Sequence, residues 1–104
     1  MNSEDLSNLL SINTVREKAQ KIKGMYNPNL INHLSKEAFD LYLIRESICN
    51  QILEITNEKD IKYGKIIDFV KKKIKENKNQ LKQTSDEIEL TLIQQIIEEW
   101  EEFL

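Results

Sequence analysis

Apolar side chains recur every three or four positions from one end of this 104-residue chain to the other. That spacing is the period of an amphipathic α-helix, whereas a half-buried strand would alternate apolar and polar residues. The chain has only two glycines and one proline, and a β-rich fold needs more turn residues than these. The pattern therefore predicts an all-α protein.

The N-terminal part of the pattern divides into two helices. A short helical piece is expected at residues 3–10. A second start follows at Thr14, because Glu17 has the spacing of a capping box relative to it. This helix should end near Gly24, ahead of Pro28, since glycine and proline are typical of helix C-termini.

The next apolar stripe is the longest and runs from Leu30 to Ile55. Pro28 suits the first turn of a helix, but Ser35 is equally suited to cap a fresh start inside the stripe. One long helix, and a short piece followed by a long one, therefore both remain open. A polar break at residues 57–60 is expected to end the helix.

Two further helices are expected in the C-terminal half. The first carries its apolar residues between Tyr63 and Leu81, and the second should begin at Thr84, where Glu87 repeats the capping-box spacing. Short connections make neighbouring helices antiparallel. The sequence therefore predicts an antiparallel up-down bundle of three or four helices with a short N-terminal helix, forming one domain over residues 1–104.

Charge is segregated between these last two helices. Residues 58–83 hold nine lysines and four acids, whereas residues 84–104 hold seven acids and no base. Antiparallel packing would set the lysine-rich helix beside the glutamate-rich one without any ligand. Each exposed ion pair contributes only about 0–1 kcal/mol, so the pattern selects neighbouring helices more than it stabilises them.

The residues that usually carry chemistry are scarce. His33 is the only histidine and Cys49 the only cysteine, too few for a zinc site of His and Cys ligands. There is no Gly-rich phosphate loop and no nucleophile elbow. Cys49 lies on the apolar stripe, as expected of a buried inert thiol, and His33 lies off it, as expected of an exposed side chain. We therefore expect no catalysis, no metal and no cofactor; the enzyme alternative that stays open is a metal shared by acids such as Asp40 and Glu46.

The expected location is the cytoplasm. A single cysteine cannot form an intramolecular disulfide, which favours a reducing compartment. The N-terminal residues lack a basic region followed by an apolar run, so no signal peptide is expected. No apolar stretch reaches the ~20 residues of a membrane span, so no membrane partner is expected either.

The long central helix has surplus apolar surface. Phe39, Leu43 and Ile44 fall outside its main stripe. A helix that is apolar on more than one side is either central in a bundle or part of an interface, so a central place, self-association and a partner groove all remain open. Arg45 projects from the middle of the main stripe, where it would snorkel, pair with a glutamate of another helix or contact a ligand.

The C-terminal residues combine acids with large apolar side chains. Trp100 continues the helical stripe, which favours a place in the core, but Trp100 and Phe103 would also suit a mobile anchor for a partner groove. The acids lie near a helix C-terminus, where the helix dipole opposes them. The lysines of the preceding helix are expected to offset that effect.

A nucleic-acid-binding surface on the lysine-rich helix is the alternative function. Its candidate residues are Lys62, Lys65, Phe69, Lys72 and Lys73. Lysines neutralise phosphates, and Phe69 lies outside the apolar stripe near three of them. The segment has no arginine, the residue best suited to bidentate contacts with bases and phosphates. A solvated surface facing the last helix is the simpler interpretation.

Absent chemistry, surplus apolar surface and segregated charge together favour a non-catalytic protein-binding module. It would act as a small inhibitor, regulator, immunity factor or accessory subunit by docking a helical face on another protein or on a second copy of itself. The residues expected to make that contact are Phe39, Leu43, Ile44, Arg45, Trp100 and Phe103.

Overall fold

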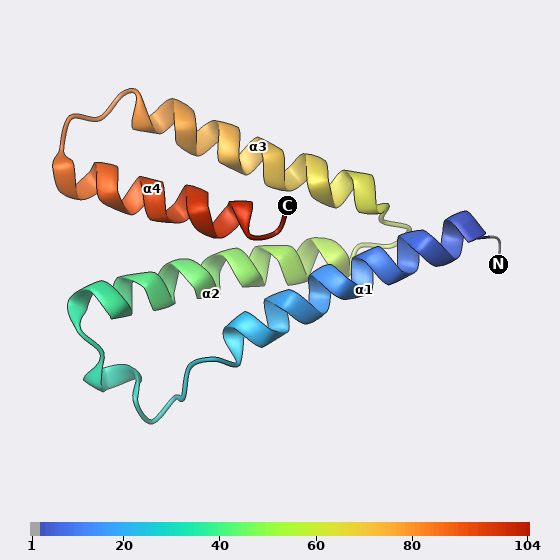
Figure 1. Cartoon of the computed structure of the whole chain (residues 1–104), viewed down its shortest axis with the longest axis horizontal. Coiled ribbons are helices and arrows are strands. Elements are labelled where there is room, and N and C mark those ends of the chain that lie inside the picture. The colour runs from blue at the N-terminus through green and yellow to red at the C-terminus, as the bar shows by residue number, and fades with distance from the viewer. Residues whose placement is uncertain (1–2) are drawn as a thin grey trace. The chain divides into compact units, whose positions relative to one another are not determined.

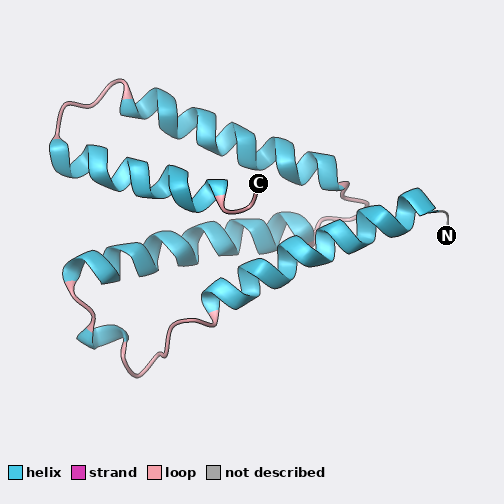
Figure 2. Ribbon diagram, in the orientation of Figure 1, coloured by secondary structure: helices cyan, strands magenta, loops and turns pink. Residues whose placement is uncertain are grey.

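The computed structural model describes residues 3–104, and it contains four α-helices and no strand within that range (Figure 1). The elements are α1 (Ser3–Lys23), the short 3₁₀ helix η1 (Ile31–His33), α2 (Lys36–Thr56), α3 (Tyr63–Leu81) and α4 (Glu87–Glu101). Loops and turns connect them (Figure 2). The all-α prediction is confirmed, and the helix contacts are consistent with a small bundle.

The contacts of the chain divide it into two compact units, Met1–Ile66 and Ile67–Leu104. The first unit holds α1, η1, α2 and the first residues of α3, and the second holds the rest of α3 together with α4. The single domain expected from the sequence stays a prediction.

In the first unit, α1 and α2 form an antiparallel hairpin (Figure 1). Hydrogen bonds join Arg16 to Thr56 and Lys23 to Asn50, so positions later in α1 meet positions earlier in α2. The buried apolar side chains of the two helices are Ile12, Val15, Ala19, Ile48, Cys49 and Ile52. Cys49 is therefore buried, as predicted, and His33 is exposed, as predicted.

α1 is one continuous helix, so the predicted second start at Thr14 is wrong. The Thr14 hydroxyl donates to the backbone oxygen of Leu10 at 2.9 Å, the bond of a residue inside a helix rather than of an N-cap. No glycine or proline interrupts the chain before Thr14. Continuing the helix also brings Ile12 onto the buried face with Val15.

The helix break at Ser35 is real, and of the two open alternatives the shorter α2 is confirmed. The Ser35 side chain accepts a hydrogen bond from the Ala38 amide at 3.2 Å and so caps α2. Before it, the Asn27 side chain accepts from the amide of Asn29 at 2.9 Å, a local turn that spans Pro28. α1 ends at Lys23, next to Gly24, as predicted.

Arg16 holds the C-terminal end of α2 against α1. Its Nη2 donates to the backbone oxygen of Thr56 at 2.8 Å, and its Nε lies 3.5 Å from the Thr56 hydroxyl oxygen. Thr56 is the last residue of α2, where carbonyl groups lack intrahelical donors and the helix dipole favours a cation. The Arg16 guanidinium therefore satisfies a free carbonyl at the end of α2 and also fixes the position of α2 on α1.

The start of α3 is also held by α1. The Asn8 side chain accepts a hydrogen bond from the amide of Tyr63, the first residue of α3, at 2.7 Å. The connecting loop turns through Asp60, which adopts a φ of 59°, a conformation that aspartate tolerates better than most residues. The sequence could not predict this hydrogen bond between Asn8 and Tyr63, because the two residues lie in different helices.

In the second unit, α3 and α4 lie side by side and antiparallel (Figure 1). The Phe69 and Trp100 rings meet edge to face, with centroids 5.8 Å apart. The buried apolar side chains of this unit are Val70, Ile74, Ile93, Ile97, Trp100 and Phe103. The core interpretation of the C-terminal aromatic residues is the one that their burial supports.

The predicted cap of α4 at Thr84 is wrong by two residues. Asp86 is the N-cap, and its carboxylate accepts from the amides of Ile88 and Glu89 at 2.9 and 3.4 Å. A carboxylate at this position satisfies free amides and also meets the positive end of the helix dipole. The Thr84 hydroxyl instead donates to the Glu89 carboxylate at 2.9 Å.

Replacing Arg16 with methionine (Arg16→Met) should lower the free energy of unfolding by about 1–3 kcal/mol, because the buried Thr56 carbonyl loses a charged donor. Urea denaturation followed by circular dichroism measures it. Lys21→Met, an exposed position on the same helix, is the matched control and should change stability by less than about 0.5 kcal/mol. Equal effects of the two changes would contradict the role of Arg16.

Removing the α4 cap with Asp86→Ala should cost about 1 kcal/mol of stability, whereas Thr84→Ala should cost clearly less, because only Asp86 accepts from the helix amides. The two unfolding free energies, compared under the same conditions, test the assignment. A larger loss for Thr84→Ala would restore the capping box that the sequence suggested.

Candidate functional site

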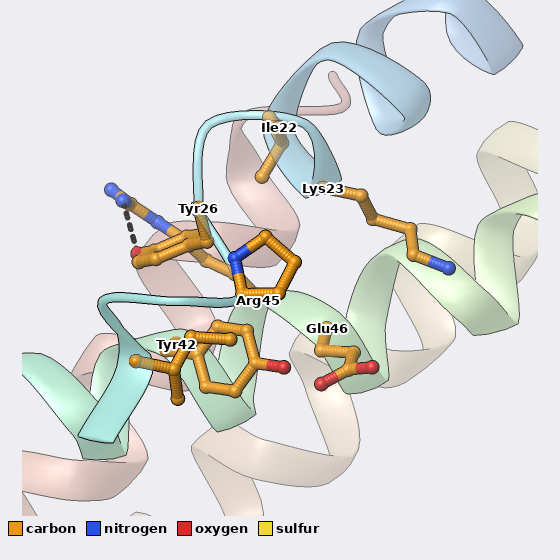
Figure 3. Close-up of a pocket in the computed structure, with 8 residues that line it drawn as sticks. Ile22, Lys23, Tyr26, Tyr42, Arg45 and Glu46 are labelled. Atoms are coloured by element: carbon orange, nitrogen blue, oxygen red, sulfur yellow. Dashed lines mark hydrogen bonds between the residues drawn. The ribbon is translucent and has the colours of Figure 1, made fainter.

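A pocket of about 130 Å³ lies in the first unit, between the end of α1, the loop that follows it and the first half of α2 (Figure 3). Its apolar and aromatic walls are Ile22, Tyr26, Pro28, Ile31 and Tyr42, and its polar residues are Lys23, Arg45 and Glu46. The pocket opens to solvent, so these groups are accessible to a ligand or a partner side chain.

Local sequence explains why these side chains meet. α1 ends at Lys23, and the turn around Pro28 carries Tyr26 and Ile31 back toward α2. In α2, the residues that line the pocket are Tyr42, Arg45 and Glu46. Their spacing of three and four positions places them on one face of a helix.

Aromatic rings build one wall of the pocket. The Tyr26 and Tyr42 rings meet nearly edge to face, with centroids 4.9 Å apart and planes inclined at 62°. The Phe39 ring lies against Tyr42 at 5.9 Å on the same helix. Such pairs fix ring orientation and contribute about 0.5–1.5 kcal/mol each beyond area burial. The wall is therefore pre-formed.

Arg45 and Glu46 each lie close to a tyrosine hydroxyl of the pocket. Arg45 Nη1 donates to the Tyr26 hydroxyl oxygen at 2.9 Å, on one side of the pocket in Figure 3. On the opposite side, the Tyr42 hydroxyl points toward the Glu46 carboxylate. The hydrogen bond to Glu46, with partial burial and the negative charge of that carboxylate, raises the pKa of Tyr42 above its ordinary value of 10.0.

Lys23 lies at the rim of the pocket. Its Nζ donates to the Asn50 side-chain oxygen at 2.6 Å, and both residues are exposed. This hydrogen bond connects Lys23 at the end of α1 to Asn50 of α2. The cation remains at the surface, where an approaching carboxylate can reach it.

The arrangement is suited to binding. Among residues 3–104, no three His, Cys, Asp or Glu side chains gather at the spacing of metal ligands. The pocket combines apolar walls with a few oriented polar groups, the usual composition of a binding site. A neutral tyrosine with a raised pKa is a poor general base near pH 7.

Of the predicted contact residues of α2, Arg45 lines this pocket and Phe39 packs against Tyr42, one of its walls. Phe39 is 37% exposed and Leu43 47% exposed, and Ile44 is half-buried. Arg45 is half-buried and lines the pocket, and the Tyr26 hydroxyl is one of its partners. The structure thus brings these four predicted residues to one end of α2.

Trp100 and Phe103, the two predicted contact residues of the second unit, are buried at 2% and 5% exposure, and Trp100 packs against Phe69. A partner would have to displace the core of that unit to reach them. The core alternative explains these two residues without any partner.

The residues predicted for nucleic-acid binding differ in their exposure and in their contacts. Lys65 and Lys72 are exposed, but the Lys73 ammonium lies 5.4 Å from the centroid of the Phe69 ring and 4.0 Å from the Glu76 carboxylate. Lys62 lines an open polar hollow of the first unit with Glu4 and Asp5. Phe69 is half-buried against Trp100 and Lys73, so its ring is not free to stack on a base. Pairing between the α3 lysines and the α4 acids stays a prediction.

Tyr26 and Tyr42 are the functional candidates that sequence reasoning missed. Both fall on apolar stripes, so the sequence pattern alone assigns them to the core. Each is half-buried, and each hydroxyl has a polar partner at the pocket. For Tyr26, its place at the end of an apolar stripe, close to a turn, was the available signal, since a partly buried hydroxyl needs a hydrogen-bond partner.

Comparison with protein-family models, with curated proteins and with solved structures finds no match to this chain. Within residues 3–104, no helix has the length and apolar character needed to cross a membrane.

Replacing Glu46 with glutamine (Glu46→Gln) should lower the pKa of Tyr42 toward its ordinary value of 10.0, because the charged acceptor of the Tyr42 hydrogen bond, and with it the negative charge that opposes the phenolate, is removed. Titration of the tyrosine Cζ carbon signals by NMR resolves Tyr42 from the other two tyrosines. Glu54→Gln, at an exposed position on the same helix, is the control and should leave the titration unchanged. An unchanged Tyr42 titration in Glu46→Gln would contradict the contact.

Proposed function

We propose that this chain is a non-catalytic protein-binding module that docks the pocket end of the α1–α2 hairpin on another protein. It acts as a small inhibitor, regulator, immunity factor or accessory subunit, in a reducing compartment such as the cytoplasm. The observation that carries the proposal is the exposure of Phe39 and Leu43 on α2, beside a pre-formed pocket with aromatic walls.

Exposed apolar residues at this end extend beyond α2. Met25 and Leu30, in the loop that frames the pocket, are 64% and 56% exposed. Single exposed apolar side chains are ordinary, but a group of them around a concave site is typical of an interaction surface. Phe39 is an anchor of the kind enriched at interface centres, since its ring is already held against Tyr42.

Nucleic-acid binding through α3 is less well supported. Phe69, the aromatic residue on which that function would depend, packs against Trp100 and Lys73. Without a free aromatic platform, the exposed lysines would offer a sequence-independent attraction to phosphates alone.

Site-specific photo-crosslinking in the producing cells tests the proposal. With p-benzoylphenylalanine in place of Leu43, the chain should form a covalent adduct with a defined protein. The same amino acid in place of Glu54, exposed at the far end of α2, should not. Adding Phe39→Ala should weaken the Leu43 adduct by about thirtyfold, the loss of about 2 kcal/mol expected of an anchor residue.

Equal crosslinking from the two positions would place no contact at the pocket end and would contradict the proposal. An adduct with nucleic acid at Leu43 would replace it by the alternative function. An adduct between two copies of the chain would identify the partner as the protein itself.

A further inference from the structure

The pocket at the end of the α1–α2 hairpin is sized for one side chain. Its volume is about 130 Å³, and an apolar protein cavity of roughly 150 Å³ holds a benzene molecule. Ile22, Ile31 and the two tyrosine rings supply the apolar contacts. A leucine, isoleucine or phenylalanine side chain from a partner fills such a space, whereas a whole helix does not.

The segment that includes the end of α1 and the loop framing the pocket is rich in lysine. Residues 18–36, which run from the second half of α1 to the start of α2, contain four lysines and no acid. All four lysines are exposed: Lys18, Lys21, Lys23 and Lys36. Extending the range to residue 46 gives five bases against three acids, a net charge of +2 in a chain whose net charge is -3.

The charged residues that line the pocket are two bases, Lys23 and Arg45, and one acid, Glu46. Together with the exposed lysines of residues 18–36, they give this part of the chain a positive balance that favours an approaching anion over a cation. Complementary charge speeds association and discriminates between partners.

Resting on the proposed function, we infer that the docked partner is an acidic protein segment that inserts one large apolar side chain into the pocket. Its carboxylates lie over the lysines of residues 18–36, and its apolar side chain lies between Tyr26, Ile31 and Tyr42. An anionic membrane offers similar charge, but a pocket of one-side-chain volume with fixed aromatic walls suits a defined side chain better than mobile acyl chains.

Selection of short random peptides on the full-length chain tests the inference. The enriched peptides should share one large apolar residue flanked by aspartate or glutamate. Replacing that residue by alanine in a synthetic peptide should weaken binding about thirtyfold or more, and binding should weaken as salt rises. Chemical-shift changes in NMR spectra should centre on Tyr26 and Tyr42.

Matched charge reversals isolate the lysine contribution. The double change Lys21→Glu and Lys36→Glu should weaken peptide binding about tenfold. The control, Lys75→Glu with Lys78→Glu, reverses two exposed lysines of α3 and should leave binding unchanged. Far-ultraviolet circular dichroism verifies that each variant is folded.

Several outcomes would overturn the inference. Enrichment of neutral or basic peptides at the same pocket would remove the acidic partner while leaving docking intact, and an absence of enriched peptides would remove the side-chain pocket. Binding to phosphatidylserine vesicles in preference to peptides would assign the surface to a membrane. If the chain forms a dimer and Ile88→Asp dissociates it, the side chain in the pocket is Ile88 of a second copy. Ile88 is 70% exposed and flanked by acids.

Discussion

The antiparallel packing of α1 on α2 is the constraint on which the docking end of the molecule depends. Ala19, Cys49 and Ile52 are almost completely buried, and close-packed interiors leave little freedom to slide one helix past the other. Arg16 binds the last residue of α2 in that register. The same register brings Tyr26, just beyond α1, to Arg45 at the opposite end of the hairpin.

The candidate site lies where the chain leaves regular structure, as binding sites often do. The turn around Pro28 and the short helix η1 form part of the pocket, while α2 supplies a rigid wall. Arg45 and Glu46 each have a tyrosine partner, so the pocket keeps its charged groups hydrogen-bonded while its apolar walls stay open to solvent. That combination suits recognition of a surface better than chemistry on a substrate.

Helix boundaries were predicted well where one residue decides them and poorly where two signals compete. Gly24 and Ser35 lie at real helix ends, because glycine and a capping hydroxyl act on their immediate neighbours. Thr14 has the same capping chemistry, but the uninterrupted helix before it already occupies the amides that it would cap. At α4 the Asp86 carboxylate takes the cap, because its charge also meets the helix dipole.

Periodicity alone was enough to establish the all-α class and to predict the burial of Cys49, since the face on which a residue lies follows from its position along one helix. For Phe39, Leu43 and Trp100 it left burial and exposure open. The pocket required the folded chain. Arg45 and Tyr26 are 19 positions apart, and Asn8 and Tyr63 are 55 positions apart. No local pattern joins residues so distant, because their meeting depends on how one helix packs against the next.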